Sequence, residues 1–341
     1  MEFFEKTCYN DKRKYCDGGR KMIFEKIEKI YRDKIYNRVD ADGSIFYFSN
    51  EDFEGLQKNA YPFRSSDGHT LSGYFYFYEG FQTERIVVFD HGMGSGHRGY
   101  MKEIELLARR GYLVFAYDHT GCMESGGETT GGFVQSLKDL NDAINIIQSD
   151  EQYRRCDLSV VGHSWGGFST LNIAAFHPEV SHLVAISGFI SVQQVLKQFF
   201  SGVAGWVGRK LYKKELAANP RFAGCTALTS LKKTAAKVLI LHSRDDKTLS
   251  CKLHFDVMRK KLGGMPNITF KEVDGKGHNP NYTEDAVKYK DAFFAEYQEL
   301  LKENALATEE AKAAFVAKHD WNRMTAQDMS VWQSIYDALE Q

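Results

Sequence analysis

The chain has 341 residues, of which 43% are hydrophobic and 26% charged, and 44 basic residues nearly balance 45 acidic ones. This composition allows a sizeable core, and the length suits one α/β domain with insertions. The near-zero net charge gives no sign of a nucleic-acid partner, and no long apolar stretch predicts stable membrane insertion. The six cysteines are scattered without a C-x-x-C spacing, which favours reduced thiols in a cytoplasmic protein over disulfides or a metal site.

The N-terminal part of the chain predicts a helix followed by antiparallel strands. Apolar residues recur at helical spacing between residues 20 and 39, so we expect an amphipathic helix that docks on the main body or, alternatively, binds a partner. Residues 44–48 and the aromatic-rich residues 70–78 predict two strands. We expect an N-terminal helical extension over residues 1–40.

Short apolar runs then alternate with helical segments up to residue 303. The runs are 86–90, 113–118, 158–163, 182–187, 237–242 and 268–273. Apolar strands that alternate with helices predict an α/β fold with a doubly wound, mostly parallel sheet covered on both faces. We expect this domain to cover residues 41–304 and a C-terminal helical extension to cover residues 305–341.

Residues 188–236 interrupt the alternation and are too long for an ordinary connection. The segment is rich in apolar side chains and lies between two sheet strands, on the side where such sheets bind ligands. We expect a helical cap over the site, with Phe199, Phe200 or Trp206 in contact with substrate. An ordinary buried helical excursion is the alternative.

Residues 162–167 have the sequence of a nucleophile elbow. They read Gly-His-Ser-Trp-Gly-Gly between a predicted strand and a predicted helix, the context in which G-x-S-x-G exposes a serine at a tight turn. Gly162 and Gly166 remove side chains that would collide in the turn, and the helix N-terminus places a positive dipole near a developing oxyanion. Ser164 is therefore the predicted nucleophile.

A nucleophilic serine needs a base and an acid that orients the base. His278 follows the last predicted strand in a glycine-flanked loop, and Asp246 follows the strand that ends near residue 242. Asp245 competes for the role of the acid. We prefer Asp246 because it lies three residues before the apolar Leu249, which would anchor the loop.

The backbone N–H groups of Met93 and Trp165 are the predicted oxyanion donors. Trp165 follows the nucleophile, and Met93 lies in His91-Gly92-Met93, directly after the first long parallel strand. Loss of one such donor typically removes roughly 3 kcal/mol of transition-state stabilisation. His91 is counted with the cap residues as substrate-binding.

The same loop supports a rival interpretation. Residues 94–99 read G-x-G-x-x-G, and Asp118 follows 19 residues later, which is the form of a dinucleotide-binding fingerprint. We disfavour it because the predicted strand ends at Asp90, several residues too early for the tight turn. It also leaves the predicted triad unexplained.

The chain resembles the α/β-hydrolase superfamily, most of all its cap-bearing esterases, monoglyceride lipases and related serine peptidases. The resemblance covers roughly residues 61–303 and rests on His91-Gly92, Asp118 with Gly121 and Ser125-Gly126-Gly127, the elbow, Asp246 and His278. The triad order Ser, Asp, His is the order of that superfamily. Its D-x-R-G-x-G-x-S stretch reads Asp-His-Thr-Gly-Cys-Met-Glu-Ser in this chain, without the arginine, which leaves the subfamily open.

These residues and the resemblance predict a serine hydrolase that cleaves carboxylic esters with apolar or aromatic groups through an acyl-enzyme intermediate. The expected partner is a small-molecule ester, and the chemistry needs no metal or organic cofactor. A peptidase or amidase on the same triad and a non-catalytic binding protein are the alternatives. The oligomeric state is left open.

Overall fold

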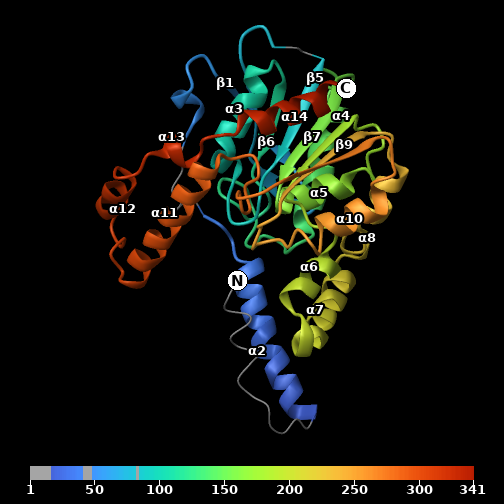
Figure 1. Cartoon of the computed structure of the whole chain (residues 1–341), viewed down its shortest axis with the longest axis vertical. Coiled ribbons are helices and arrows are strands. Elements are labelled where there is room, and N and C mark those ends of the chain that lie inside the picture. The colour runs from blue at the N-terminus through green and yellow to red at the C-terminus, as the bar shows by residue number, and fades with distance from the viewer. Residues whose placement is uncertain (1–16, 41–47, 82–83) are drawn as a thin grey trace.

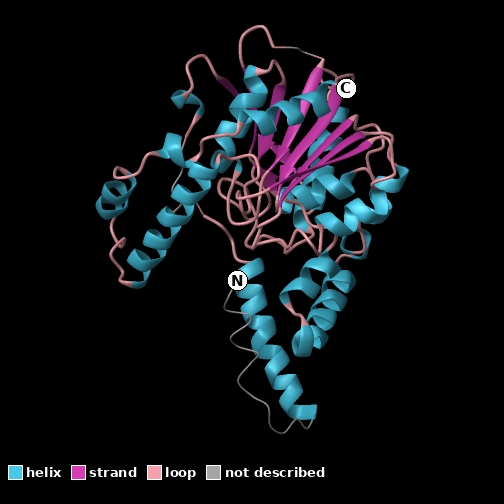
Figure 2. Ribbon diagram, in the orientation of Figure 1, coloured by secondary structure: helices cyan, strands magenta, loops and turns pink. Residues whose placement is uncertain are grey.

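A computed structural model describes residues 17–40, 48–81 and 84–341, and its centre is one mixed sheet with helices on both faces (Figures 1 and 2). The strand order is β1-β4-β6-β5-β7-β8-β9-β10. The bounds are β1 (Gln57–Ala60), β4 (Gly73–Phe77), β5 (Arg85–Asp90), β6 (Leu113–Tyr117), β7 (Asp157–His163), β8 (His182–Ile186), β9 (Lys237–Ser243) and β10 (Ile268–Val273). β4 is antiparallel to β1 and β6, and all the remaining pairs are parallel.

The doubly wound, mostly parallel sheet is confirmed, and each predicted apolar run forms one of the strands β5 to β10. The run 70–78 is divided into β3 (Thr70–Leu71), which pairs with β2 (Phe63–Arg64), and β4. β1 was not predicted, because its four side chains are all exposed and carry no apolar pattern. The predicted strand 44–48 lies outside the described residues except for Phe48.

Alternate side chains of the parallel strands pack on opposite faces of the sheet. In β6, Phe115 and Tyr117 belong to one hydrophobic cluster, whereas Val114 and Ala116 belong to the other. The first cluster includes α4 (Gln135–Ser149), α5 (Trp165–Ile173) and α10 (Phe255–Leu262), and the second includes α3 (Met101–Arg109) and α14 (Met329–Glu340). Burial on both faces explains why these strands are continuous apolar runs.

Residues 188–236 are mostly helical and project beyond the carboxyl ends of the strands (Figure 1). They form α6 (Val192–Phe199), η3 (Gly202–Ala204), α7 (Gly205–Ala218), α8 (Pro220–Ala223), α9 (Ala227–Ser230) and η4 (Leu231–Lys233). The N-terminal helix α2 (Asp17–Ile35) packs beside α7. The hydroxyls of Tyr31 and Tyr36 both donate to Glu215 Oε1 of α7 at 2.6 Å, so the N-terminal helix is tied to the cap as well as to the body.

After β10, the last strand in the sequence, three helices form an arm on one side of the molecule (Figure 1). These are α11 (Glu284–Lys302), α12 (Glu309–Val316) and α13 (Trp321–Met324). The chain then returns as α14, whose Trp332 and Ile335 are fully buried in the cluster that contains sheet residues. The predicted boundary at residue 304 therefore does not coincide with the end of the sheet domain, because α14 is one of the layers that cover the sheet.

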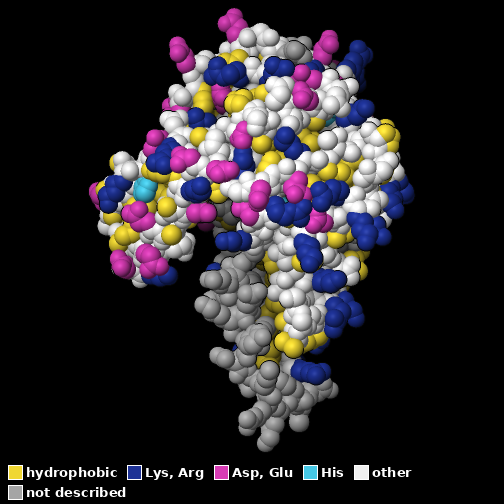
Figure 3. Space-filling view, viewed as in Figure 1, with side chains coloured by type: hydrophobic (Ala, Val, Ile, Leu, Met, Phe, Trp, Pro, Cys, Tyr) yellow, Lys and Arg dark blue, Asp and Glu magenta, His cyan; other side chains and the backbone are white. Residues whose placement is uncertain are grey.

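Charge is unevenly distributed over the surface. Figure 3 shows acidic and basic side chains mixed over the sheet domain, whereas basic side chains predominate along the edge of the cap. Residues 188–236 contain eight Lys and Arg and a single acidic residue, Glu215, which is buried. Within the described part of the chain, no helix combines the length and apolar character needed to cross a membrane.

Candidate active site

Ser164 lies at the turn between β7 and α5 with φ 57° and ψ −107°. Positive φ is uncommon for a residue other than glycine, and such strain concentrates at functional sites. A Cβ on Gly162 would lie 2.4 Å from the carbonyl oxygen of Gly166, and a Cβ on Gly166 would lie 2.0 Å from that of Asp90. Because neither position has room for a side chain, the two glycines allow the close packing that holds Ser164 at the turn.

The imidazole of His278 lies between Ser164 and Asp246. Its Nε2 is 2.9 Å from Ser164 Oγ, and its Nδ1 is 2.7 Å from Asp246 Oδ2. The three residues follow β7, β9 and β10, and parallel strands bring their carboxyl ends to the same edge of the sheet. If Nδ1 carries the proton and donates to the carboxylate, Nε2 is free to accept a proton from the serine hydroxyl.

Asp246 is a buried carboxylate with its acceptor positions filled. Its Oδ1 accepts the backbone N–H groups of Thr248 and Leu249 at 2.8 and 2.9 Å. Burial works to raise the pKa of Asp246, but His242 and His278 outweigh burial and hold that pKa well below its ordinary value. Asp246 is therefore negatively charged when it faces His278.

Asp245 has a different set of contacts. Its Oδ1 accepts the Ser243 hydroxyl at 2.5 Å and the backbone N–H groups of Lys276 and Gly277 at 3.2 and 3.0 Å. It therefore supports the backbone of the loop that carries His278, while the neighbouring aspartate contacts the imidazole.

The two predicted oxyanion donors flank the nucleophile. A Cβ added to Gly92 would lie 3.4 Å from Ser164 Cβ, so the residue before Met93 lies against the serine. Trp165 is the first residue of α5. Within the described residues, neither the Met93 N–H nor the Trp165 N–H is hydrogen-bonded to another backbone group. Free N–H groups at these two positions suit the stabilisation of an oxyanion.

A buried chain of hydrogen bonds, which the sequence did not predict, connects the oxyanion loop to the base. The N–H of Gly92 donates to Tyr100 Oη at 3.1 Å, and Tyr100 Oη is 2.9 Å from His163 Nδ1. His163 Nε2 is 2.8 Å from the carbonyl oxygen of His278. Because a carbonyl only accepts, Nε2 carries the proton of His163, and Nδ1 accepts from the tyrosine hydroxyl.

Burial, together with repulsion from His278, lowers the pKa of His163 to about 3. The ring is therefore neutral, and its tautomer is fixed by its two partners. His163 is the variable residue that precedes the serine in G-x-S-x-G. The motif alone gave no signal of this role, because any residue type satisfies it at that position.

Two of the predicted substrate-binding residues are buried within the protein and must be corrected. His91 is 0% exposed; its Nδ1 is 2.8 Å from the carbonyl oxygen of Gly92, and its Nε2 accepts the N–H of His119. Phe200 is 1% exposed and packs where α6 meets Gly208 of α7. The first supports the oxyanion loop, and the second belongs to the core of the cap.

The other two cap residues are partly exposed. The Trp206 ring packs 6.2 Å from the ring of Phe24 in α2, so it joins the cap to the N-terminal helix. The Phe199 ring lies 6.3 Å from that of Phe133, whose carbonyl oxygen accepts the indole N–H of Trp165 at 2.7 Å. Of the predicted cap residues, Phe199 is therefore the one connected to the elbow.

The glycine-rich loop does not form a dinucleotide site. It leads into the short η2 (His97–Tyr100), and the carboxylate of Asp118 is 2.8 Å from both the backbone N and Nδ1 of His97. Burial works to raise the pKa of Asp118, but His97 outweighs burial and lowers it to about 2. Asp118 Oδ2 accepts the backbone N–H of Glu124 at 3.3 Å, and the side chain is 1% exposed, so this carboxylate is engaged by its own loops instead of facing a ligand.

The loop that carries His278, residues 274–283, is also held from the C-terminal side. The Lys276 ammonium group forms an ion pair with Asp328, and the carbonyl oxygen of Asn281 accepts the Asp328 N–H at 2.8 Å. The segment between the arm and α14 thus fixes this loop at two points.

Comparison of the amino-acid sequence with known proteins finds a matching family and several relatives. The model of a family described as serine aminopeptidase, S33, matches residues 82–227. The uncharacterized protein YqkD of Bacillus subtilis is 23% identical over 276 residues, which are 79% of this chain and 87% of that protein. Monoglyceride lipase of Rattus norvegicus is 33% identical over 112 residues, which are 32% of this chain and 36% of the lipase.

Solved structures share the fold at low sequence identity. An esterase of Pyrococcus furiosus has a TM-score of 0.56 at 18% identity, over 79% of this chain and 97% of the esterase. An acylaminoacyl peptidase of Pyrococcus horikoshii has a TM-score of 0.52 at 17% identity, over 72% of this chain and 42% of the peptidase. The sheet order and these similarities show that the chain has the α/β-hydrolase fold.

Proposed function

We propose that the chain is a serine hydrolase that cleaves carboxylic esters with apolar or aromatic groups through an acyl-enzyme intermediate. The observation that carries this proposal is the position of the His278 imidazole, within hydrogen-bond distance of both Ser164 Oγ and Asp246 Oδ2. Similarity to proteins named esterase, monoglyceride lipase and peptidase supports hydrolysis of an acyl bond.

In this mechanism, Ser164 Oγ forms a bond to the substrate carbonyl carbon while His278 Nε2 takes the hydroxyl proton. The carbonyl electron pair moves onto oxygen, where the N–H groups of Met93 and Trp165 stabilise the negative charge. Collapse breaks the bond to the alcohol oxygen, which leaves with the proton from Nε2. Water then attacks the acyl-enzyme in the same manner and releases the acid, while Asp246 stabilises each imidazolium.

The proposed preference for apolar groups rests on the side chains near the elbow. Phe199 is half-buried and packs toward Phe133, beside the indole of Trp165. Aromatic side chains at this position would bind apolar acyl or alcohol groups and exclude water from the acyl-enzyme.

Labelling with a fluorophosphonate probe tests the nucleophile. Wild-type protein should be labelled and should hydrolyse p-nitrophenyl esters, whereas Ser164→Ala should lose both properties and keep the fold. Ser159→Ala is the matched control: Ser159 lies within β7, the strand that precedes the elbow, and its hydroxyl is 3.1 Å from His182 Nδ1. Full labelling of Ser164→Ala would refute the assignment.

A panel of substrates distinguishes the proposed esterase from a peptidase or amidase and from a non-catalytic binding protein. Esters with acyl chains of two to twelve carbons and aminoacyl p-nitroanilides should be compared on the same protein. Faster turnover of the anilides would favour a peptidase or amidase on the same triad. Wild-type protein that is neither labelled nor active would favour the non-catalytic binding protein.

A further inference from the structure

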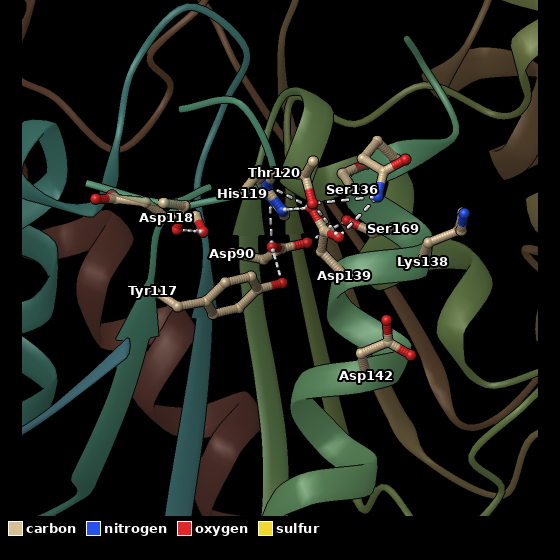
Figure 4. Close-up of polar contacts among 12 residues, drawn as sticks. Asp90, Tyr117, Asp118, His119, Thr120, Ser136, Lys138, Asp139, Asp142 and Ser169 are labelled. Carbon is tan, nitrogen blue, oxygen red and sulfur yellow. Dashed lines mark hydrogen bonds and ion pairs between the residues drawn. The ribbon is translucent and has the colours of Figure 1, made fainter. Parts of the chain in front are cut away.

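A second group of charged side chains lies beneath the elbow, and the proposed mechanism does not use it. His119, in the loop after β6, is 0% exposed, and its ring lies between two aspartates (Figure 4). Its Nε2 is 2.9 Å from Asp90 Oδ1, and its Nδ1 is 3.3 Å from Asp139 Oδ2. Both carboxylates are also fully buried. We call these three residues the Asp90–His119–Asp139 cluster.

The remaining partners of the two carboxylates are neutral donors, one of which is the side-chain amide of Gln135, which donates to Asp139 Oδ1 at 2.9 Å. The Tyr117 hydroxyl donates to Asp90 Oδ1 at 2.8 Å, and the Ser169 hydroxyl of α5 donates to Oδ2 (Figure 4). The N–H and hydroxyl of Thr120 donate to Asp139 at 2.8 and 2.9 Å. Among these partners the ring of His119 is the one that can carry a positive charge, which a buried carboxylate requires as a counter-charge.

The surroundings of the ring agree with a charged imidazolium. Burial works to lower the pKa of His119, but Asp90 and Asp139 outweigh burial and raise it to about 9. The other titratable groups that face the ring are His91 and Tyr117, with ring centroids 4.3 and 5.1 Å away. Burial lowers the pKa of His91 to about 3 and raises that of Tyr117 well above 10, so both are neutral at physiological pH.

One side of the cluster supports the oxyanion loop. Asp90 is three residues before Met93, and the backbone N–H of His119 donates to His91 Nε2 at 3.0 Å. With Nε2 accepting, His91 Nδ1 carries the proton and donates to the carbonyl oxygen of Gly92 at 2.8 Å. This fixes the peptide that precedes the Met93 N–H.

The other side of the cluster supports the elbow. The His119 ring packs 4.8 Å from the Trp165 ring, and the Ser169 hydroxyl ties the first turns of α5 to Asp90. The carbonyl of Asp90 lies so close to Gly166 that a Cβ there would be 2.0 Å away. The cluster therefore contacts both backbone turns that supply the oxyanion donors.

We propose that His119 is a positioning residue for ester hydrolysis: its positive charge holds the Asp90 and Asp139 carboxylates together and so fixes the backbone turns that present the Met93 and Trp165 N–H groups. The proposal rests on the proposed function. Its particular claim is that the charge of the ring, rather than its shape alone, sets the alignment of the oxyanion donors.

Steady-state kinetics on a p-nitrophenyl ester test this claim. His119→Gln should lower kcat at least about 10-fold, toward the 10²–10³-fold loss of one oxyanion donor, and change KM less than about twofold, because the donors act on the transition state. His182→Gln, at the opposite end of the sheet, is the matched control for loss of a buried histidine and should keep the wild-type kcat.

Charge balance gives the decisive comparison. Adding Asp139→Asn to His119→Gln restores the net charge of the cluster and should return kcat to within about threefold of wild type. Wild-type kcat in folded His119→Gln, or no recovery in the double variant, would overturn the proposal.

The pH profile gives a readout that does not depend on a foldable His119 variant. Wild-type kcat should fall as the pH rises through about 9, where the ring loses its proton. Asp139→Asn removes one of the two carboxylates that favour the charged ring, so this alkaline limb should move to lower pH by about one unit or more. An unchanged alkaline limb would overturn the proposal.

Failure of the proposed function has a different signature. If the proposed function is wrong, the fluorophosphonate probe does not label wild-type protein. If only this proposal is wrong, the protein is labelled and active, but substitutions in the Asp90–His119–Asp139 cluster leave kcat unchanged. The charge is also measured without activity, from the ¹⁵N chemical shifts of the His119 ring. A ring that is neutral at pH 7 would overturn the proposal.

Discussion

Replacing Tyr100 with Phe removes one oxygen from the chain of hydrogen bonds that connects the oxyanion loop to the base. The Tyr100 side chain is almost fully buried, and its hydroxyl contacts both the Gly92 N–H and His163 Nδ1. The variant leaves those two groups buried without their partner. Each unsatisfied group typically costs about 1–3 kcal/mol, so the free energy of unfolding should fall by about 2–6 kcal/mol for the two groups together.

The corresponding change in melting temperature follows from the size of the chain. An unfolding entropy of about 2.1 cal/mol/K per residue over the 341 residues converts this loss into a Tm decrease of about 3–8 °C. Because His163 also binds the carbonyl of His278, kcat should fall by roughly 10-fold, since small displacements of catalytic groups have large effects on rate. Thermal unfolding and ester turnover measure the two effects.

Tyr112→Phe is the matched control. The Tyr112 side chain is buried, and its hydroxyl makes no hydrogen bond to any described residue. Its removal should change Tm by less than about 1 °C and leave kcat unaltered. Equal decreases in Tm for both variants, or a Tyr100→Phe variant with the Tm and kcat of wild type, would refute the role assigned to the hydrogen-bonded chain.

Asp246→Asn should lower kcat by roughly 10⁴, because an amide favours the wrong tautomer of the base; Asp245→Asn should lower it less than about 100-fold, and a larger effect at Asp245 would reverse the assignment. Gly166→Ala places a Cβ 2.0 Å from the Asp90 carbonyl oxygen. It should lower the free energy of unfolding, measured in urea, by more than about 4 kcal/mol. A variant as stable as wild type would show that the backbone at residue 166 can shift away from Asp90. Phe199→Ser should raise KM for p-nitrophenyl laurate more than KM for p-nitrophenyl acetate. Equal changes in the two KM values would show that Phe199 does not contribute to the preference for apolar acyl groups.

The parallel strands, and the positions of the three side chains that meet at His278, could be predicted from the sequence because their signals are local. A strand buried on both faces is a continuous apolar run, as in β5 to β9, whereas β10 carries Lys271 and Glu272 and is only partly buried. Ser164, Asp246 and His278 each lie within five residues of the end of one of these strands. Since parallel strands end at one edge, sequence positions far apart become neighbours without any knowledge of the contacts.

The polar support of the site could not be predicted in the same way. His163, Tyr100 and His119 act through partners up to 115 residues away, and a buried polar side chain follows no period along the chain. His91 lies in a motif associated with the oxyanion loop, yet its type alone did not show that its ring faces inward. In the cap, the apolar pattern indicated burial but did not show whether Phe200 faces substrate or the core.

The contacts of the His278 loop with the segment before α14 determine when the site is complete during synthesis. The chain is made from its N-terminus, so the strained elbow at Ser164 can form while residues beyond β10 have yet to appear. The loop gains its ion pair between Lys276 and Asp328 only after the whole arm has been made. The Arg85 guanidinium at the start of the central strand β5 donates to the carbonyl oxygen of Leu339, so this contact at the amino end of the strand forms later still. In a nascent chain, the contacts that hold the His278 loop therefore become available only after the residues of the Ser164 turn, the arm and the start of α14 have all been made.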